Sequence, residues 1–202
     1  MSSHIQAFLI TATVACTPTS GAKMIVQPDA AVDTTPKPRA FVTSTSYSGD
    51  LKTAGAGTSG LDGADKLCQV ASTAAGLAGT FKAWLSDSTT NAIDRLVDVG
   101  GWYVVGTDFE LFDSKAALVS PPANAFADET GALVGGEPWT GTLSNGTENT
   151  NDGFVGTSGN CASWTASSMD SGATGASLQP GEWTQSAAYQ CQNLRPIYCF
   201  QQ

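Results

Sequence analysis

The segment Cys191-Gln-Asn-Leu-Arg-Pro-Ile-Tyr-Cys199 lies close to the end of a chain of 202 residues, and its two cysteines are the strongest indication of the fold. Two more cysteines, Cys68 and Cys161, precede it, and a fifth, Cys16, lies far upstream behind an apolar run. Four cysteines plus one predict two disulfides and a separate chemical fate for the fifth, although four cysteines permit three pairings. Because disulfides persist in oxidising compartments, we expect the domain to work outside the cytosol.

The composition fits one globular domain with a surface poor in charge. The chain is long enough to bury a core of ordinary size. Only 13% of its residues are charged, whereas 22 are glycines. Its formal net charge is −9, and an acidic surface repels phosphates and anionic lipids. We therefore expect no nucleic acid partner, and contact with a membrane only through a lipid anchor.

The first 16 residues predict a leader that ends in a lipid-anchored cysteine. The apolar run Ala7-Phe-Leu-Ile-Thr-Ala-Thr-Val-Ala15 before Cys16 resembles the signal peptide of a bacterial lipoprotein. Two features depart from that pattern, because Thr13 replaces the usual leucine and the leader has no lysine or arginine. A cleaved leader without lipid is the alternative. Thr17 follows in place of the aspartate that retains lipoproteins at the inner membrane, which favours an outer-membrane or cell-surface location, or secretion.

A proline-rich linker is expected over residues 17–39, before a domain over residues 40–202. The linker contains Pro18, Pro28, Pro36 and Pro38 without apolar periodicity, and proline removes a backbone donor and fixes φ.

The domain pattern predicts an α+β fold, with two helices packed on short, mostly antiparallel strands and with long loops. Apolar residues recur at helical spacing over residues 61–75, which places Cys68 on a buried helix face. A shorter helix is expected over residues 87–96, capped by Asp87 or Ser88. Strands are expected over residues 41–46, 81–86, 102–105, 139–143, 161–165 and 197–200. Loops are expected over residues 47–60, 145–159 and 167–179, and loop with a short helix over residues 114–136.

Several of these segments together resemble endostatin, a collagen domain with a C-type-lectin-like fold. The matching segments are Leu61-Asp-Gly-Ala-Asp-Lys-Leu-Cys68, residues 75–86, Cys161-Ala-Ser-Trp164, residues 185–188 and the segment from Cys191 to Cys199. The resemblance covers nearly all of residues 40–202, and similar domains occur in bacterial surface lipoproteins. It implies nested disulfides that pair Cys68 with Cys199 and Cys161 with Cys191.

The residue types argue against an enzyme. The single histidine, His4, falls in the expected leader, so Ser–His and Cys–His machinery and histidine-containing zinc sites are not expected in the domain. Endostatin's zinc site does not carry over, because it relies on histidines. Its arginine-rich heparin site does not carry over either, since Arg95 and Arg195 are well separated. A carboxylate pair, as in glycosidases, is the remaining catalytic alternative.

A calcium site is the weaker of two interpretations of the loop over residues 145–159. Ca²⁺ needs six to eight oxygen ligands, and this loop offers Asn145, Glu148, Asn149 and Asp152. The lectin tripeptide Gln27-Pro28-Asp29 falls in the linker instead. We expect a solvated loop and no cofactor.

Tryptophans are the other candidates for ligand contact, because aromatic rings stack on sugars and anchor interfaces. Trp183 follows a polar loop and is the best candidate for an exposed ligand-binding ring. The sequence therefore predicts a non-catalytic, adhesin-like binding module of the cell surface, which recognises an extracellular protein or glycan through loops 145–159 and 167–183. A structural or assembly protein of the surface is the alternative, and a carbohydrate-active enzyme is the third.

Overall fold

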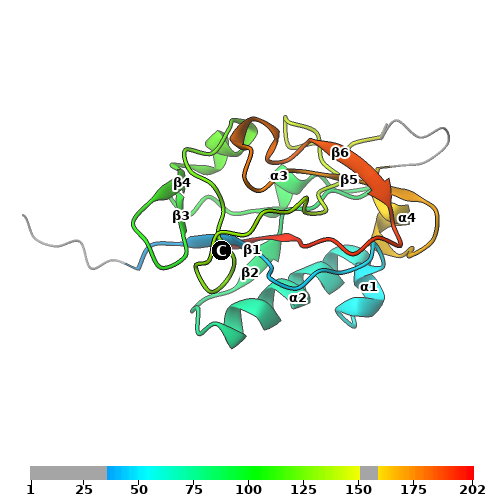
Figure 1. Cartoon of the computed structure of the whole chain (residues 1–202), viewed down its shortest axis with the longest axis horizontal. Helices are drawn as coiled ribbons and strands as arrows, with labels where there is room; N and C mark the ends of the chain where they lie inside the picture. Colours follow the sequence, from blue (N-terminus) through cyan, green and yellow to red (C-terminus); the bar gives the residue numbers. More distant parts are fainter. Residues whose placement is uncertain (1–35, 151–158) are drawn as a thin grey trace, which may run out of the picture. The chain divides into compact units, whose positions relative to one another are not determined.

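The computed structural model describes residues 36–150 and 159–202, and they form an α+β domain (Figure 1). A five-stranded sheet has the order β2-β7-β1-β3-β4, and a separate sheet pairs β5 with β6. The strands are β1 Arg39–Val42, β2 Phe81–Ala83, β3 Trp102–Val104, β4 Glu110–Phe112, β5 Ser171–Thr174, β6 Ala187–Gln190 and β7 Tyr198–Gln201. The helices are α1 Leu51–Ala54, α2 Gly60–Ala74, α3 Ala92–Arg95 and α4 Cys161–Trp164, with 3-10 turns η1 Lys115–Val119 and η2 Pro180–Glu182.

The last strand lies inside the sheet and joins distant parts of the chain. β7 pairs antiparallel with β1 on one side and with β2 on the other, so that Cys199 is opposite both Phe41 and Ala83. β1 pairs parallel with β3, and β3 pairs antiparallel with β4. The expected strands around residues 41, 81, 102 and 198 are therefore confirmed.

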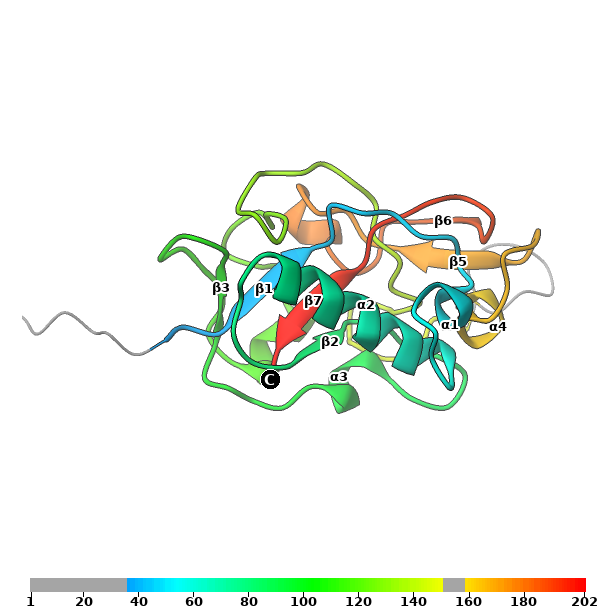
Figure 2. The ribbon, with the colours of Figure 1, turned by 90° about the horizontal axis from the view of Figure 1, so that it is seen from below.

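Helix α2 covers one face of the sheet (Figure 2). Its start is fixed by Ser59, whose hydroxyl accepts a hydrogen bond from the Asp62 backbone N–H at 3.2 Å, which is an N-cap arrangement. Cys68 on the buried face is bonded to Cys199 in β7. The predicted helix over residues 61–75 is confirmed, and it is the only one of the described α-helices that is longer than a single turn.

The two faces of the sheet carry different cores. Phe81, Ala83 and Leu85 pack on the face toward α2, whereas Trp84 points to the other face. On that second face the loops enclose an aromatic cluster, which comprises Trp84, Trp102, Phe112, Phe126, Trp183, Tyr198 and Phe200.

Two disulfides hold the domain together with the pairing that the resemblance implied. Cys68–Cys199 spans 131 residues and Cys161–Cys191 spans 30 residues. The bonds indicate an oxidising environment. Among the described residues, no helix is both long and apolar enough to cross a bilayer.

The prediction of a strand over residues 161–165 is wrong. All four residues of α4 have positive φ, from 49° at Cys161 to 62° at Trp164. Such left-handed backbone costs roughly 1–2 kcal/mol per residue outside glycine, and burial of Cys161 and Trp164 offsets this cost. Asn160 caps the turn, because its side-chain oxygen accepts from the Ser163 N–H at 2.9 Å.

Other boundaries also differ from the sequence prediction. The expected loop over residues 167–179 contains the buried strand β5, and the loop over residues 47–60 contains α1. The segment over residues 139–143 makes only isolated bridges, at Trp139 and Thr142. Asp87 caps no helix, since Asn91 precedes α3. The first strand begins at Arg39, at the end of the expected linker.

Candidate binding groove

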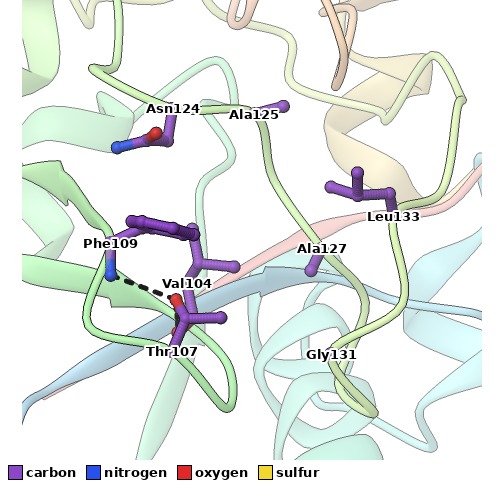
Figure 3. Close-up of a pocket in the computed structure, with 8 residues that line it drawn as sticks. All are labelled: Val104, Thr107, Phe109, Asn124, Ala125, Ala127, Gly131 and Leu133. Carbon is purple, nitrogen blue, oxygen red and sulfur yellow. Dashed lines mark hydrogen bonds between the residues drawn. The ribbon is translucent and has the colours of Figure 1, made fainter. Parts of the chain in front are cut away.

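An apolar groove of about 370 Å³ lies beside the β3–β4 turn. We call it the Phe109–Leu133 groove, after the side chains that Figure 3 shows on its opposite sides. One wall comes from β3 and its turn, and the other from residues 124–133. The lining residues are Val104, Thr107, Phe109, Asn124, Ala125, Ala127, Gly131 and Leu133.

Two large apolar side chains of this groove are held in solvent. Phe109 is 64% exposed and Leu133 is 71% exposed. A single exposed apolar residue needs no explanation, but two that flank one apolar hollow are typical of an interaction site.

Arg39 fixes the wall that carries Phe109. Its guanidinium Nη1 donates to the carbonyl oxygens of Val104 at 2.9 Å and Thr107 at 2.5 Å. The Phe109 N–H donates to the Thr107 hydroxyl at 3.1 Å, and its carbonyl accepts from the Val104 N–H at 2.9 Å. Four contacts thus hold a turn of the chain that would otherwise have little structure of its own.

Lys37 adds a second, exposed support to the same turn. Its ammonium group lies 2.9 Å from the Asp108 carboxylate and 4.9 Å from the centre of the Tyr103 ring. The hydrogen bond from Lys37, and then its charge, lower the pKa of Asp108 below the ordinary value. Solvent screens such a pair, so its role is to orient the turn.

Two adjacent carboxylates fix the opposite wall. Asp128 Oδ1 accepts from the Thr130 N–H at 2.8 Å, the Thr130 hydroxyl at 2.6 Å and the Ala132 N–H at 3.0 Å. Burial raises the pKa of Asp128, but these hydrogen bonds outweigh it and hold that pKa below the ordinary value. Glu129 accepts from the backbone N–H and the hydroxyl of Ser44, at the end of β1. The tight turn that presents Leu133 is therefore preorganised.

A smaller pocket of about 220 Å³ lies next along β4 and is acidic. It is lined in part by Glu110 and Asp113, whereas the neighbouring groove is lined by Phe109. Asn124 lines the apolar groove, and its Nδ2 donates to the Glu110 carbonyl at 2.6 Å. In the described part of the chain, neither Glu110 nor Asp113 forms an ion pair.

Trp183 is not the exposed ring that the sequence suggested, and that prediction is wrong. It is 3% exposed, and its ring lies 5.0 Å from those of Trp84 and Phe112. Its indole N–H donates to the Ser120 carbonyl at 3.1 Å. The ring therefore fills the core and is almost fully withdrawn from solvent.

The residues considered for calcium bind other protein groups. Asn145 Oδ1 accepts from the N–H and hydroxyl of Thr147, and Glu148 Oε1 accepts from Asn160 at 2.8 Å. Asn149 is 5% exposed, which does not fit a fully solvated loop. In residues 36–150 and 159–202 no three His, Cys, Asp or Glu side chains group as metal ligands. Asp152, like Cys16, lies outside the described residues.

The pKa of the Glu148 carboxylate is raised above its ordinary value. Burial is the main cause and the nearby Asp87 carboxylate the second, while the hydrogen bond from Asn160 acts in the opposite direction. Asp87 itself is 8% exposed and accepts from the N–H groups of Thr89 and Thr90. The Asp87 carboxylate therefore holds the turn over residues 87–90.

The Phe109–Leu133 groove was not predicted from the sequence. Its residues come from glycine-flanked loops, Val105-Gly-Thr-Asp-Phe109 and Gly131-Ala-Leu-Val-Gly135. The signal that could have revealed them is a large apolar residue inside such a loop, where neither helical nor strand periodicity requires one.

Comparison with known proteins leaves the site to be judged on its geometry. No family model matches this chain, and no curated protein matches it either.

Proposed function

We propose that this chain is a non-catalytic binding module of the cell surface or secreted, with a C-type-lectin-like, endostatin-like fold, and that it binds a protein ligand in the Phe109–Leu133 groove. The fold proposal is supported by the nested disulfides and by α2 packed on the sheet. Folds of this kind host many functions, so the groove has to carry the functional argument.

The observation that carries the function is the pair of exposed apolar side chains on preorganised walls. Keeping Phe109 and Leu133 in solvent costs free energy, which the chain would gain by burying these side chains. Hydrogen bonds of Arg39 and Asp128 nevertheless hold the turns that keep them exposed. A rigid apolar hollow of about 370 Å³ accepts an apolar side chain of a partner without paying to order its own loops. Its lining offers few of the polar groups that recognise sugars.

The test is selection from a displayed peptide library against the full chain, compared with a double variant, Phe109→Ser with Leu133→Ser. The matched control is Val70→Ser with Leu194→Ser, because both of these residues are 67% exposed and neither lines the groove. Peptides with a common apolar residue, lost only with the groove variant, would support the proposal. Selected peptides that bind both variants equally would refute it.

Two further measurements separate the alternatives. A glycan array with Ca²⁺ and again with EDTA tests a sugar ligand, and EDTA-sensitive binding would favour a calcium lectin site. Sedimentation of the wild type and the groove variant tests the assembly alternative, in which the same apolar groove joins copies of this chain.

A further inference from the structure

We infer that the partner presents an apolar side chain to the Phe109–Leu133 groove and a cationic side chain to the acidic pocket beside it. This inference rests on the proposed function and specifies the class of its ligand: a protein segment that carries Leu- or Phe-like and Lys- or Arg-like residues a few positions apart.

The acidic pocket carries two carboxylates. Glu110 and Asp113 line it, and within residues 36–150 and 159–202 no lysine or arginine lies in salt-bridge range of either carboxylate. The only polar contact shown for these two side chains is at Asp113, whose carboxylate accepts from the Ser114 hydroxyl at 2.8 Å. Two unneutralised carboxylates at one hollow are complementary to a cation of the partner.

The two hollows adjoin along one segment of the chain. Phe109 lines the apolar groove, and the next residue, Glu110, lines the acidic pocket together with Asp113. Residues 109 and 113 are separated by roughly 13 Å in extended chain. An extended peptide spans that distance with three or four residues, which sets the spacing expected between its apolar and cationic side chains.

The whole chain favours the same partner charge. Its net charge is −9, so a basic segment is attracted from a distance and its association is slowed by salt. Near the groove, the cations Lys37 and Arg39 are occupied by Asp108 and by the carbonyls of the β3–β4 turn, and they do not neutralise the pocket.

The experiment is an array of immobilised nine-residue peptides in a Ser/Gly background, probed with the full chain with both disulfides intact. One position is Leu, and a second position, two to five residues away, is Lys, Gln or Glu. We expect Leu–Lys peptides at a spacing of three or four to bind best, with Gln three- to tenfold weaker and Glu weaker still.

Variants assign the preference to the pocket. Glu110→Gln with Asp113→Asn should remove the preference for Lys over Gln but keep the dependence on Leu. The control, Asp94→Asn with Asp170→Asn, makes an equal change of charge elsewhere and should leave both the Lys preference and the Leu dependence unchanged. Binding that depends on Leu but treats Lys, Gln and Glu alike overturns this inference and leaves the proposed function standing. Absence of any Leu-dependent binding overturns both.

Discussion

Replacing Asp128 tests whether a buried carboxylate holds the Leu133 wall. Alanine at this position removes the acceptor of three hydrogen bonds, from the Thr130 N–H, the Thr130 hydroxyl and the Ala132 N–H. A net contribution of about 0.5–1.5 kcal/mol per bond, reduced because water reaches part of the turn, gives an expected loss of about 1–3 kcal/mol. Urea unfolding followed by tryptophan fluorescence measures this loss.

Asp128→Asn separates the charge from the geometry. The amide oxygen still accepts, so we expect a smaller loss, of about 0.5–1.5 kcal/mol, near neutral pH. The pKa of Asp128 is lower in the folded protein than its ordinary value of 3.8, so the charged form stabilises the fold above that pH and this contribution is lost as the pH falls through the folded pKa. The difference between wild type and Asp128→Asn should therefore be constant from about pH 5 to 8 and shrink below about pH 4.

The quantity to follow is the difference in unfolding free energy between wild type and Asp128→Asn. Asp62 and Asp108 also have lowered pKa values and contribute equally to the pH profiles of both proteins. A loss below 0.5 kcal/mol for Asp128→Ala, or a wild-type-minus-variant difference that does not change with pH, would show that the carboxylate does not hold the turn. The Asp128→Ala variant should also lose groove binding, since its Leu133 wall is no longer ordered.

Three other predictions concern the core and its titrating groups. Trp183→Ala should destabilise the fold by about 3–5 kcal/mol, because it opens the aromatic cluster, whereas Trp183→Phe should cost clearly less; equal unfolding midpoints for wild type and Trp183→Ala would contradict burial of the ring. Glu148→Gln should raise stability at pH 7 by a few tenths of a kcal/mol, because burial and Asp87 disfavour the charged form of Glu148. This gain should vanish as the pH falls below the ordinary carboxyl range. A lower melting temperature of the variant than of the wild type at pH 7 would contradict the prediction. Burial raises the pKa of Tyr198 well above 10.0, so the neutral phenol keeps its full contribution to stability below about pH 10 and that contribution is lost as the pH rises from there toward the folded pKa. Absorbance at 295 nm should show Tyr198 ionising together with unfolding; its titration in the folded protein near pH 10 would refute this.

The regular elements of this fold could be predicted from periodicity. Helix α2 repeats apolar residues at helical spacing, so Cys68 was placed correctly on a buried helix face, and β1, β2, β3 and β7 lie where strands were expected. Burial on one side imposes these periods on the sequence, and tertiary contacts did not override them.

Elements built from small or mixed residues gave misleading patterns. Cys161-Ala-Ser-Trp164 alternates like a strand, but capping by Asn160 and the bond to Cys191 favour a left-handed turn. Strand β5 consists of Ser171-Gly-Ala-Thr174, which lacks the bulky residues typical of strands. A side chain on Gly172 would meet the Cys161 sulfur at 2.7 Å, so close packing requires this composition.

The candidate site was harder to predict because loops bring it together. Phe109 and Leu133 flank one groove because the segment that leads into the 128–133 turn runs beside β1. There the Val42 N–H donates to the Ala127 carbonyl at 2.9 Å. No spacing in the sequence encodes that contact. Trp183 was misplaced for a related reason, since a ring that follows a polar loop gives no sign of which side it faces.

The position of β7 has a consequence for the order of events in folding. Its partner β1 is more than 150 residues earlier in the chain, at residues 39–42 against 198–201, and contacts of such separation slow folding because a large loop must close first. Without residues 198–201, β2 has no partner that joins it to β1, β3 and β4, so the sheet cannot be completed as the polypeptide emerges. A ribosome-bound or translocating chain of this protein stays open to proteases and to chaperones until its final strand is released.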